Sequence, residues 1–284
     1  MKGLIIAAGY GTRFLPATKT VPKEMLPLMD KPSVAFIVEE MIQSGIKDIV
    51  IITSRRKKCM DDFFDREVEL ERELSLKNKT ELLEKIKPYE GVNICFIRQQ
   101  EMKGVGHAML QAESVIGNEP FVVAYPDDLH FGEKPLAKQL IDAYNESGCT
   151  VLATLFDPPQ LYAYAALKLA SDGVHVEDLV EKPAPGSAPS KEASIGRYLY
   201  TPEIFKALHE AWAEHTGPGE FYHVDGLKKL CAAGKVIFKR VEGARYDIGT
   251  PEGFLKATVA YACRVPEWEK VLIEEVKKRT GGEG

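Results

Sequence analysis

Three cationic side chains follow two glycines near the start of the chain. Gly9 and Gly11 come first, and a loop stiffened by prolines then carries Arg13, Lys19 and Lys23. The glycine pair alone is equally typical of an ordinary tight turn. However, it follows an apolar run that predicts a strand buried on both faces, and such a loop leaves backbone N–H groups free to converge on an anion. With the cations close behind, the arrangement predicts a binding site for a polyphosphate.

Two later segments carry side chains that would complete such a site. Asp127 follows the apolar run Phe121–Tyr125, and a carboxylate at a strand end beside a triphosphate suits Mg²⁺. An aspartate that only caps the following turn is the alternative at this position. Gln99 ends another predicted strand, and its amide can both donate to and accept from the edge of a pyrimidine base. His107 stands at a predicted helix start, where a structural role is more common than general-base catalysis.

The N-terminal segment resembles the signature loop of the sugar-1-phosphate nucleotidylyltransferases, which reads G-x-G-T-R and, several residues later, P-K. The chain carries this pattern in the string GYGTRFLPATKTVPKEMLPL, and weaker similarity to the family continues to about Arg264. The loop is not a Rossmann fingerprint, because Phe14 stands where the third glycine is expected. It is not a Walker A loop either, because no Gly-Lys-Ser/Thr closes it.

The resemblance implies an α/β fold of the nucleotide-diphospho-sugar transferase type. The expected architecture is a three-layer sandwich with a Rossmann-like mixed sheet and a C-terminal helical arm. A nucleotidylyltransferase domain is expected over residues 1–264, with its nucleotide-binding part at about 1–130 and its sugar-binding part at about 150–250. A helical extension is expected over residues 265–284.

The resemblance also implies roles for individual residues. The expected nucleotide-binding positions are Ala7, Ala8, Gly9, Gly11, Thr12, Gln99, Gly104 and Gly106. The expected sugar-binding positions are Glu181 for the hydroxyls, Lys182 for the phosphate, and Ala165 and Gly196 beside them. The catalytic cations are Arg13, Lys23 and Lys182, and the ligands of Mg²⁺ are Asp127 and Asp247. Asp128 is expected either to support the metal ligands or to face solvent.

The activity that the resemblance implies is Mg²⁺-assisted transfer of a uridylyl group from UTP to glucose 1-phosphate, giving UDP-glucose and pyrophosphate. Two alternatives stay open: a related transferase that uses dTTP or another sugar 1-phosphate, and a non-catalytic relative that binds nucleotide sugars. Two departures from the family pattern concern the sugar. Ala165 stands where the family has glycine, and Phe221-Tyr222-His223 replaces Gln-Leu-Thr. A homo-oligomer is also expected.

Alternating strands and helices must position these side chains. An amphipathic helix over Ser33–Gly45 and a strand over Asp48–Thr53 follow the first strand, and this alternation is typical of a parallel sheet. Ligands of such sheets gather at the carboxyl ends of the strands, where Gln99 and Asp127 are predicted to stand. The charged segment Arg55–Lys87 is expected to form a solvated helical flap, with a binding surface as the alternative.

Composition limits the remaining possibilities. The chain has 284 residues, 45% hydrophobic and 28% charged, which suits a globular protein with a sizeable core. A net charge of −5 gives no support for a nucleic-acid partner, and no apolar run is long enough for a membrane span. The start of the chain does not resemble a signal peptide. Five scattered cysteines without a C-x-x-C favour inert thiols, so a cytoplasmic location is expected.

Overall fold

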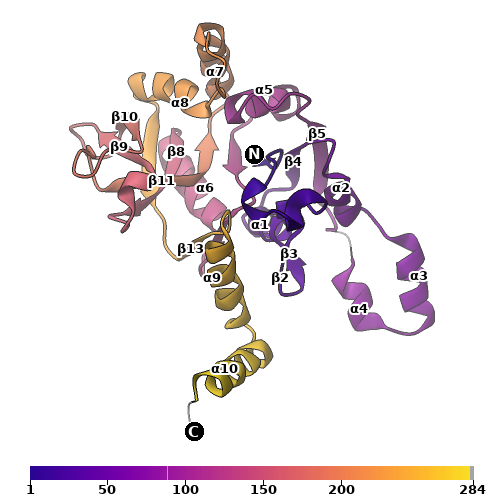
Figure 1. The fold of residues 1–284 in the computed structure, drawn as a ribbon. Coiled ribbons are helices and arrows are strands. Elements are labelled where there is room, and N and C mark those ends of the chain that lie inside the picture. Colours follow the sequence, from indigo (N-terminus) through magenta and orange to yellow (C-terminus); the bar gives the residue numbers. More distant parts are fainter. Residues whose placement is uncertain (88, 282–284) are drawn as a thin grey trace.

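The computed structural model describes residues 1–87 and 89–281 (Figure 1). The nine strands of its main sheet are β1 (Lys2–Ile6), β4 (Asp48–Thr53), β5 (Asn93–Arg98), β6 (Phe121–Ala124), β8 (Thr150–Phe156), β9 (Ala165–Leu169), β10 (Val176–Glu181), β11 (Glu192–Tyr200) and β12 (Val236–Arg240). The short strands outside it are β2 (Pro27–Leu28), β3 (Lys31–Pro32), β7 (Asp128–Phe131) and β13 (Ala244–Asp247).

The helices alternate with these strands along the chain. The α-helices are α1 (Ser33–Gln43), α2 (Lys58–Phe64), α3 (Val68–Leu76), α4 (Thr80–Lys85), α5 (Val105–Ile116), α6 (Leu136–Ser147), α7 (Glu203–Glu214), α8 (His223–Ala232), α9 (Pro251–Ala262) and α10 (Pro266–Thr280). Single 3-10 turns are η1 (Thr12–Phe14), η2 (Ala17–Lys19), η3 (Lys23–Met25) and η4 (Leu161–Ala163).

The main sheet is mixed, as the resemblance implied. Its strands follow the order β10-β9-β11-β6-β1-β4-β5, and β8 pairs with both β11 and β12. Strands β1, β4, β5 and β6 run parallel, whereas β11 is antiparallel to β6, β8 and β9. The parallel half therefore presents all its carboxyl ends at one edge, which is the edge that collects ligands in such sheets.

Successive residues of the parallel strands enter two separate cores. Leu4 and Ile52 pack in one core beneath α5 and α7, and Ile5 and Ile51 pack in the other beneath α1 and α6. This division follows from the strand period of two, which turns neighbouring side chains to opposite faces of the sheet. Helices thus cover both faces, and the predicted three-layer sandwich is confirmed.

Two helical segments extend away from this sandwich (Figure 1). Helices α3 and α4 form the flap expected from the charged segment Arg55–Lys87, and α10 continues from α9 as the expected C-terminal arm. Residues 282–284 of that arm lie outside the described residues, and a domain division at residue 264 stays a prediction. None of the helices within residues 1–87 and 89–281 has the length and apolar character needed to cross a membrane.

Candidate active site

The glycine loop leaves the sheet at the carboxyl end of β1. Ala7 and Ala8 are buried, and the N–H of Ala7 still donates to the sheet through the carbonyl of Ile52 at 2.8 Å. Gly9 is exposed, with open space around its Cα. Gly11 has a φ of +67°, in the left-handed region that favours glycine, and a Cβ there would lie 3.2 Å from Cβ of Lys23. The chain therefore folds back and brings Lys23 against Gly11.

A buried ion pair fixes both ends of this loop. Nζ of Lys57 donates to the carbonyl of Ala7 at 2.5 Å and to Oε1 of Glu24 at 2.8 Å, and both charged side chains are buried. Burial lowers the pKa of the Lys57 ammonium, and the Glu24 carboxylate opposes this shift. Because Glu24 follows Lys23 directly, the pair also positions that cation. Nothing in the sequence distinguished Lys57 from the other charges of its segment.

Two short strands bring the expected metal ligands together. Asp127 lies directly before β7 and Asp247 ends β13, and these strands pair antiparallel with Asp247 opposite Asp128. The N–H of Ile248 donates to the carbonyl of Asp127 at 2.8 Å, which continues the pairing by one residue. The backbones of the two aspartates are thus joined although they are far apart in the sequence.

The side chains of these aspartates meet two of the expected cations around Gly249. A methyl group built on this glycine would lie 3.0 Å from Oδ1 of Asp247, 3.2 Å from Oδ2 of Asp127 and 3.4 Å from Nη1 of Arg13. Nζ of Lys23 lies 2.5 Å from Oδ2 of Asp127. Two predicted cations and two predicted metal ligands therefore form one cluster.

This cluster fits a divalent cation that is shared with a phosphorylated substrate. Within residues 1–87 and 89–281, no three His, Cys, Asp or Glu side chains are grouped so that they could hold a metal ion by themselves. Mg²⁺ is commonly held by only one or two carboxylates, with phosphate oxygens and water as its other ligands. In this structure the ammonium of Lys23 contacts the carboxylate of Asp127. This carboxylate therefore already faces a positive charge, which is the environment that a metal ion would also provide.

The expected base pocket lies at the end of β5. Gln99 is buried, and its Nε2 lies 3.1 Å from both the carbonyl of Gly104 and Nδ1 of His107. A Cβ on Gly104, whose φ is +96°, would overlap the backbone of Phe221, and one on Gly106 would lie 2.6 Å from the Phe221 ring. Both glycines thus serve close packing against Phe221. The contacts of His107 agree with a structural role, and base binding by these residues stays a prediction.

The expected sugar residues lie around the end of β10. Ala165 is buried on β9 and pairs with Glu181, the last residue of β10. Lys182 follows with a φ of +44°, and its N–H donates to the carbonyl of Tyr164 at 3.0 Å. A left-handed lysine is uncommon and costs about 1–3 kcal/mol, so such positions are often functional. The turn also ends the strand alternation, which would otherwise send Glu181 and Lys182 to opposite faces.

Tyr125 follows β6 directly and stands two residues before Asp127. Burial raises the pKa of the Tyr125 hydroxyl well above its ordinary value. The carboxylates of Asp127, Asp128 and Glu181 raise this pKa further through their charges.

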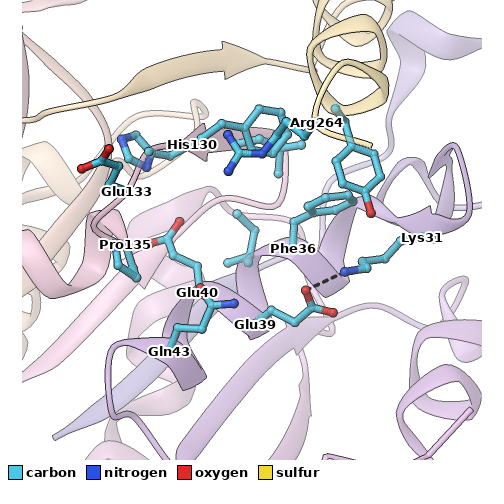
Figure 2. Close-up of a pocket in the computed structure, with 14 residues that line it drawn as sticks. Lys31, Phe36, Glu39, Glu40, Gln43, His130, Glu133, Pro135 and Arg264 are labelled. Carbon is cyan, nitrogen blue, oxygen red and sulfur yellow. Dashed lines mark hydrogen bonds and ion pairs between the residues drawn. The ribbon is translucent and has the colours of Figure 1, made fainter. Parts of the chain in front are cut away.

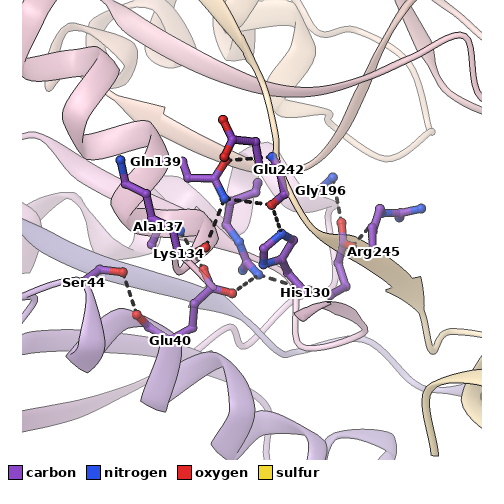
Figure 3. A network of polar contacts seen from close by, with 11 residues as sticks. Glu40, Ser44, His130, Lys134, Ala137, Gln139, Gly196, Glu242 and Arg245 are labelled. Atoms are coloured by element: carbon purple, nitrogen blue, oxygen red, sulfur yellow. Dashed lines mark hydrogen bonds and ion pairs between the residues drawn. The ribbon is translucent and has the colours of Figure 1, made fainter. Parts of the chain in front are cut away.

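Asp128 is buried, so the expectation that it could face solvent is wrong. Its Oδ2 accepts from the N–H of Gly196 at 2.9 Å, and its Oδ1 accepts from Nε of Arg245 at 2.7 Å (Figure 3). A Cβ on Gly196 would lie 2.6 Å from Oδ2 of Asp128, so this glycine admits the carboxylate. Reasoning from the sequence assigned no role to Arg245, although this residue stands two positions before Asp247 in the motif.

A separate cavity of about 190 Å³ lies between α1, β7 and α9 (Figure 2). It is lined by apolar rings and by charged groups of both signs, including Lys31, Glu39, His130 and Arg264. Nζ of Lys31 donates to Oε2 of Glu39 at 2.7 Å across its edge. None of the residues predicted from the sequence to bind a substrate or a metal lines this cavity.

Comparisons with known proteins agree with this geometry. The family model described as nucleotidyl transferase matches residues 2–264. The chain is 44% identical to UTP–glucose-1-phosphate uridylyltransferase 2 of Staphylococcus saprophyticus over 282 residues, 98% of this chain and 97% of that protein.

Two solved structures of similar fold contain a bound nucleotide or nucleotide sugar. The chain is similar to a UTP-bound UGPase from Acinetobacter baumannii, with a TM-score of 0.87, 31% identity and coverage of 96% of this chain and 98% of that one. It is also similar to a UDP-glucose pyrophosphorylase complexed with UDP-glucose, with a TM-score of 0.79, 37% identity and coverage of 93% and 98%.

Proposed function

The chain belongs to the nucleotidyl transferase family, and we propose that it transfers the uridylyl group of UTP to glucose 1-phosphate, forming UDP-glucose and releasing pyrophosphate. One observation carries the proposal beyond the family. Arg13 and Lys23 meet Asp127 and Asp247 around Gly249, at the edge of the sheet where ligands collect. Relatives named for this reaction, and structures with UTP or UDP-glucose bound, support the choice of substrates.

The reaction needs charge neutralisation more than proton transfer. A phosphate oxygen of glucose 1-phosphate is already an anion at neutral pH, so it can attack the α-phosphorus of UTP without a general base. Lys182 would hold the attacking phosphate, and Arg13 and Lys23 would stabilise the charge on the departing pyrophosphate. Holding the two substrates in line converts their encounter into an effectively unimolecular step.

Asp127 and Asp247 would hold Mg²⁺ beside these cations. When bound, the ion supplies positive charge that offsets the repulsion between the two phosphorylated substrates. The role of the two aspartates in the proposed reaction is to bind the ion. Their part is to keep two carboxylate oxygens at a fixed place, which the pairing of β7 with β13 provides.

The remaining residues complete the proposal. The nucleotide would be bound by Ala7, Ala8, Gly9, Gly11, Thr12, Gln99, Gly104 and Gly106, and the sugar by Glu181, Lys182, Ala165 and Gly196. Uracil and thymine present the same edge to Gln99, so this residue does not distinguish UTP from dTTP. A homo-oligomer and a cytoplasmic location stay predictions.

A substrate panel tests the proposal. Pyrophosphate release is measured with Mg²⁺, pairing UTP, dTTP, CTP and ATP separately with glucose 1-phosphate and galactose 1-phosphate. We expect rapid release with UTP and glucose 1-phosphate. Rapid release with another pair alone would keep the reaction type and replace the substrates. Nucleotide-sugar binding without release for any pair would favour the non-catalytic alternative.

A further inference from the structure

Arg245 joins the metal side of the proposed site to its sugar side. Its Nε donates to Oδ1 of Asp128 at 2.7 Å, its Nη1 donates to the hydroxyl of Tyr164 at 2.9 Å, and its side chain is only 12% exposed. We infer that Arg245 is a positioning residue that holds the aspartate pair Asp127 and Asp247 at a fixed place relative to Lys182. This inference rests on the proposed function.

The contacts on the metal side act through the backbone. Asp128 accepts a hydrogen bond from Nε of Arg245. It is the residue after Asp127, and it pairs with Asp247 across the two strands. The second oxygen of the Asp128 carboxylate is held by the N–H of Gly196 (Figure 3). Arg245 itself stands on β13, two residues before Asp247. A displacement of its guanidinium would therefore move both expected metal ligands.

The contacts on the sugar side act through Tyr164. Its hydroxyl accepts from Arg245, and the guanidinium also lies 5.3 Å from the centre of its ring. Its carbonyl accepts from the N–H of Lys182 at 3.0 Å. The next residue, Ala165, pairs with Glu181. One side chain thus reaches the backbone that sets the left-handed turn at Lys182.

The chemistry of the guanidinium explains why an arginine stands here. A guanidinium stays charged in proteins, and this one forms a largely buried ion pair with the carboxylate of Asp128. Its planar fork donates in two fixed directions at once, toward Asp128 and toward Tyr164. A lysine at the same position would present one ammonium and could not hold both partners in the same geometry.

A positioning role predicts a defined kinetic signature. A misplacement of about 1 Å can cost roughly 100-fold in rate even when each substrate still binds. Loss of the Arg245 contacts should therefore lower kcat and raise KM for glucose 1-phosphate, while the Kd of UTP measured without Mg²⁺ stays near that of the wild type. UTP contacts are expected mainly on the N-terminal loop and on the segment that follows β5, which Arg245 does not touch in any described contact.

The experiment uses Tyr164→Phe, Arg245→Lys and Arg245→Gln, with Tyr162→Phe as the control. Tyr162 lies two residues from Tyr164 and its side chain is 53% exposed. UDP-glucose formation is followed at saturating UTP, the Kd of UTP by calorimetry without Mg²⁺, and unfolding by circular dichroism. We expect kcat to fall about tenfold in Tyr164→Phe and about 100-fold in Arg245→Gln, with the Kd of UTP within about twofold of wild type.

The outcomes separate the inference from the proposed function. If the wild type is active and both Tyr164→Phe and Arg245→Lys keep kcat and KM within about twofold, the inference is overturned and the proposed function stands. A merely structural role would lower the unfolding temperature and leave the kinetics of the folded protein unchanged. If Arg245→Gln does not fold, the kcat of Tyr164→Phe alone tests the inference. A wild type that forms no nucleotide sugar overturns the proposed function and this inference together.

Discussion

Asp127 and Lys182 are the single residues on which the proposed chemistry depends most directly. Asp127 contacts Lys23 and shares the space around Gly249 with Asp247 and Arg13, and Lys182 is held in a left-handed turn at the end of β10. Neither side chain is part of a hydrophobic core. Their roles can therefore be tested without disturbing the fold.

We expect Asp127→Ala and Lys182→Ala to lower turnover about 100-fold or more, because the first removes a proposed ligand of Mg²⁺ and the second the proposed partner of the attacking phosphate. Pyrophosphate release measures the loss, and circular dichroism checks that the melting temperature is retained. Turnover within about threefold of wild type for either folded variant would remove that residue from the proposed site.

Gly249→Ala probes the space between the charged groups. The added methyl would lie 3.0–3.4 Å from Asp247, Asp127 and Arg13, in the space that we propose for the substrates and Mg²⁺. Gly249 is not among the residues with positive φ, so alanine does not strain the backbone. We expect turnover to fall about tenfold or more with little change in melting temperature.

Gly219→Ala is the matched control for that substitution. A Cβ on Gly219 would meet nothing within 4 Å, and its φ is not positive either. It should leave turnover unchanged. Equal activity of the two variants would show that the space around Gly249 is not used by the substrates.

At the scale of elements, the glycine loop after β1 depends on the buried Lys57–Glu24 pair. Lys57→Met leaves Glu24 as a buried charge without its partner, which typically costs about 3–5 kcal/mol of the free energy of unfolding. We expect Lys57→Met/Glu24→Leu to recover part of this loss, because no unpaired charge remains. Urea denaturation measures both variants.

An exposed ion pair on the flap gives the comparison for this prediction. Arg66 and Glu71 lie 2.5 Å apart, and Arg66→Met should change the free energy of unfolding little because that pair is solvated. If Lys57→Met lowered the free energy of unfolding as little as Arg66→Met, the Lys57–Glu24 pair would not be what stabilises the glycine loop.

The elements that sequence reasoning found are those with a strong local pattern. The bounds of β4 and α1 were predicted to within two residues. A continuous apolar run indicates β4, and apolar residues at helical spacing indicate α1. β7 and β13 were missed. Each has four residues of mixed character, DLHF and ARYD, and they become strands only because they pair with each other across the chain.

The same reasoning explains which site residues were found. Arg13, Lys23 and Asp127 stand in contiguous motifs, so the resemblance marked them, and the structure brings them together. Lys57 and Arg245 act through contacts with residues that are distant in the chain. No local sequence pattern predicts such contacts.

At the scale of the whole molecule, a buried histidine links stability to pH. His223 is buried at the start of α8, Tyr200 lies 2.9 Å from its Nδ1, and burial lowers its pKa from 6.5 to about 4. The unfolded chain therefore binds a proton more readily than the folded one between these values. The stabilisation is complete above pH 6.5 and is lost as the pH falls toward 4.

We expect protonation of His223 to lower the free energy of unfolding by up to about 3 kcal/mol between neutral pH and pH 4. His223→Gln keeps an acceptor for Tyr200 and does not titrate, so its stability should fall less steeply with acid. Denaturation curves at several pH values measure the difference. Parallel pH dependence in the two proteins would contradict the assignment.

The most direct test of the proposed activity is phosphorus NMR of the protein with UTP, glucose 1-phosphate and Mg²⁺. The proposed transfer predicts that UDP-glucose and pyrophosphate appear in equal amounts as both substrates disappear. It also predicts that both signals appear at least about 100-fold more slowly with Asp127→Ala at the same protein concentration. Inorganic phosphate as the main product, or pyrophosphate without UDP-glucose, would contradict uridylyl transfer.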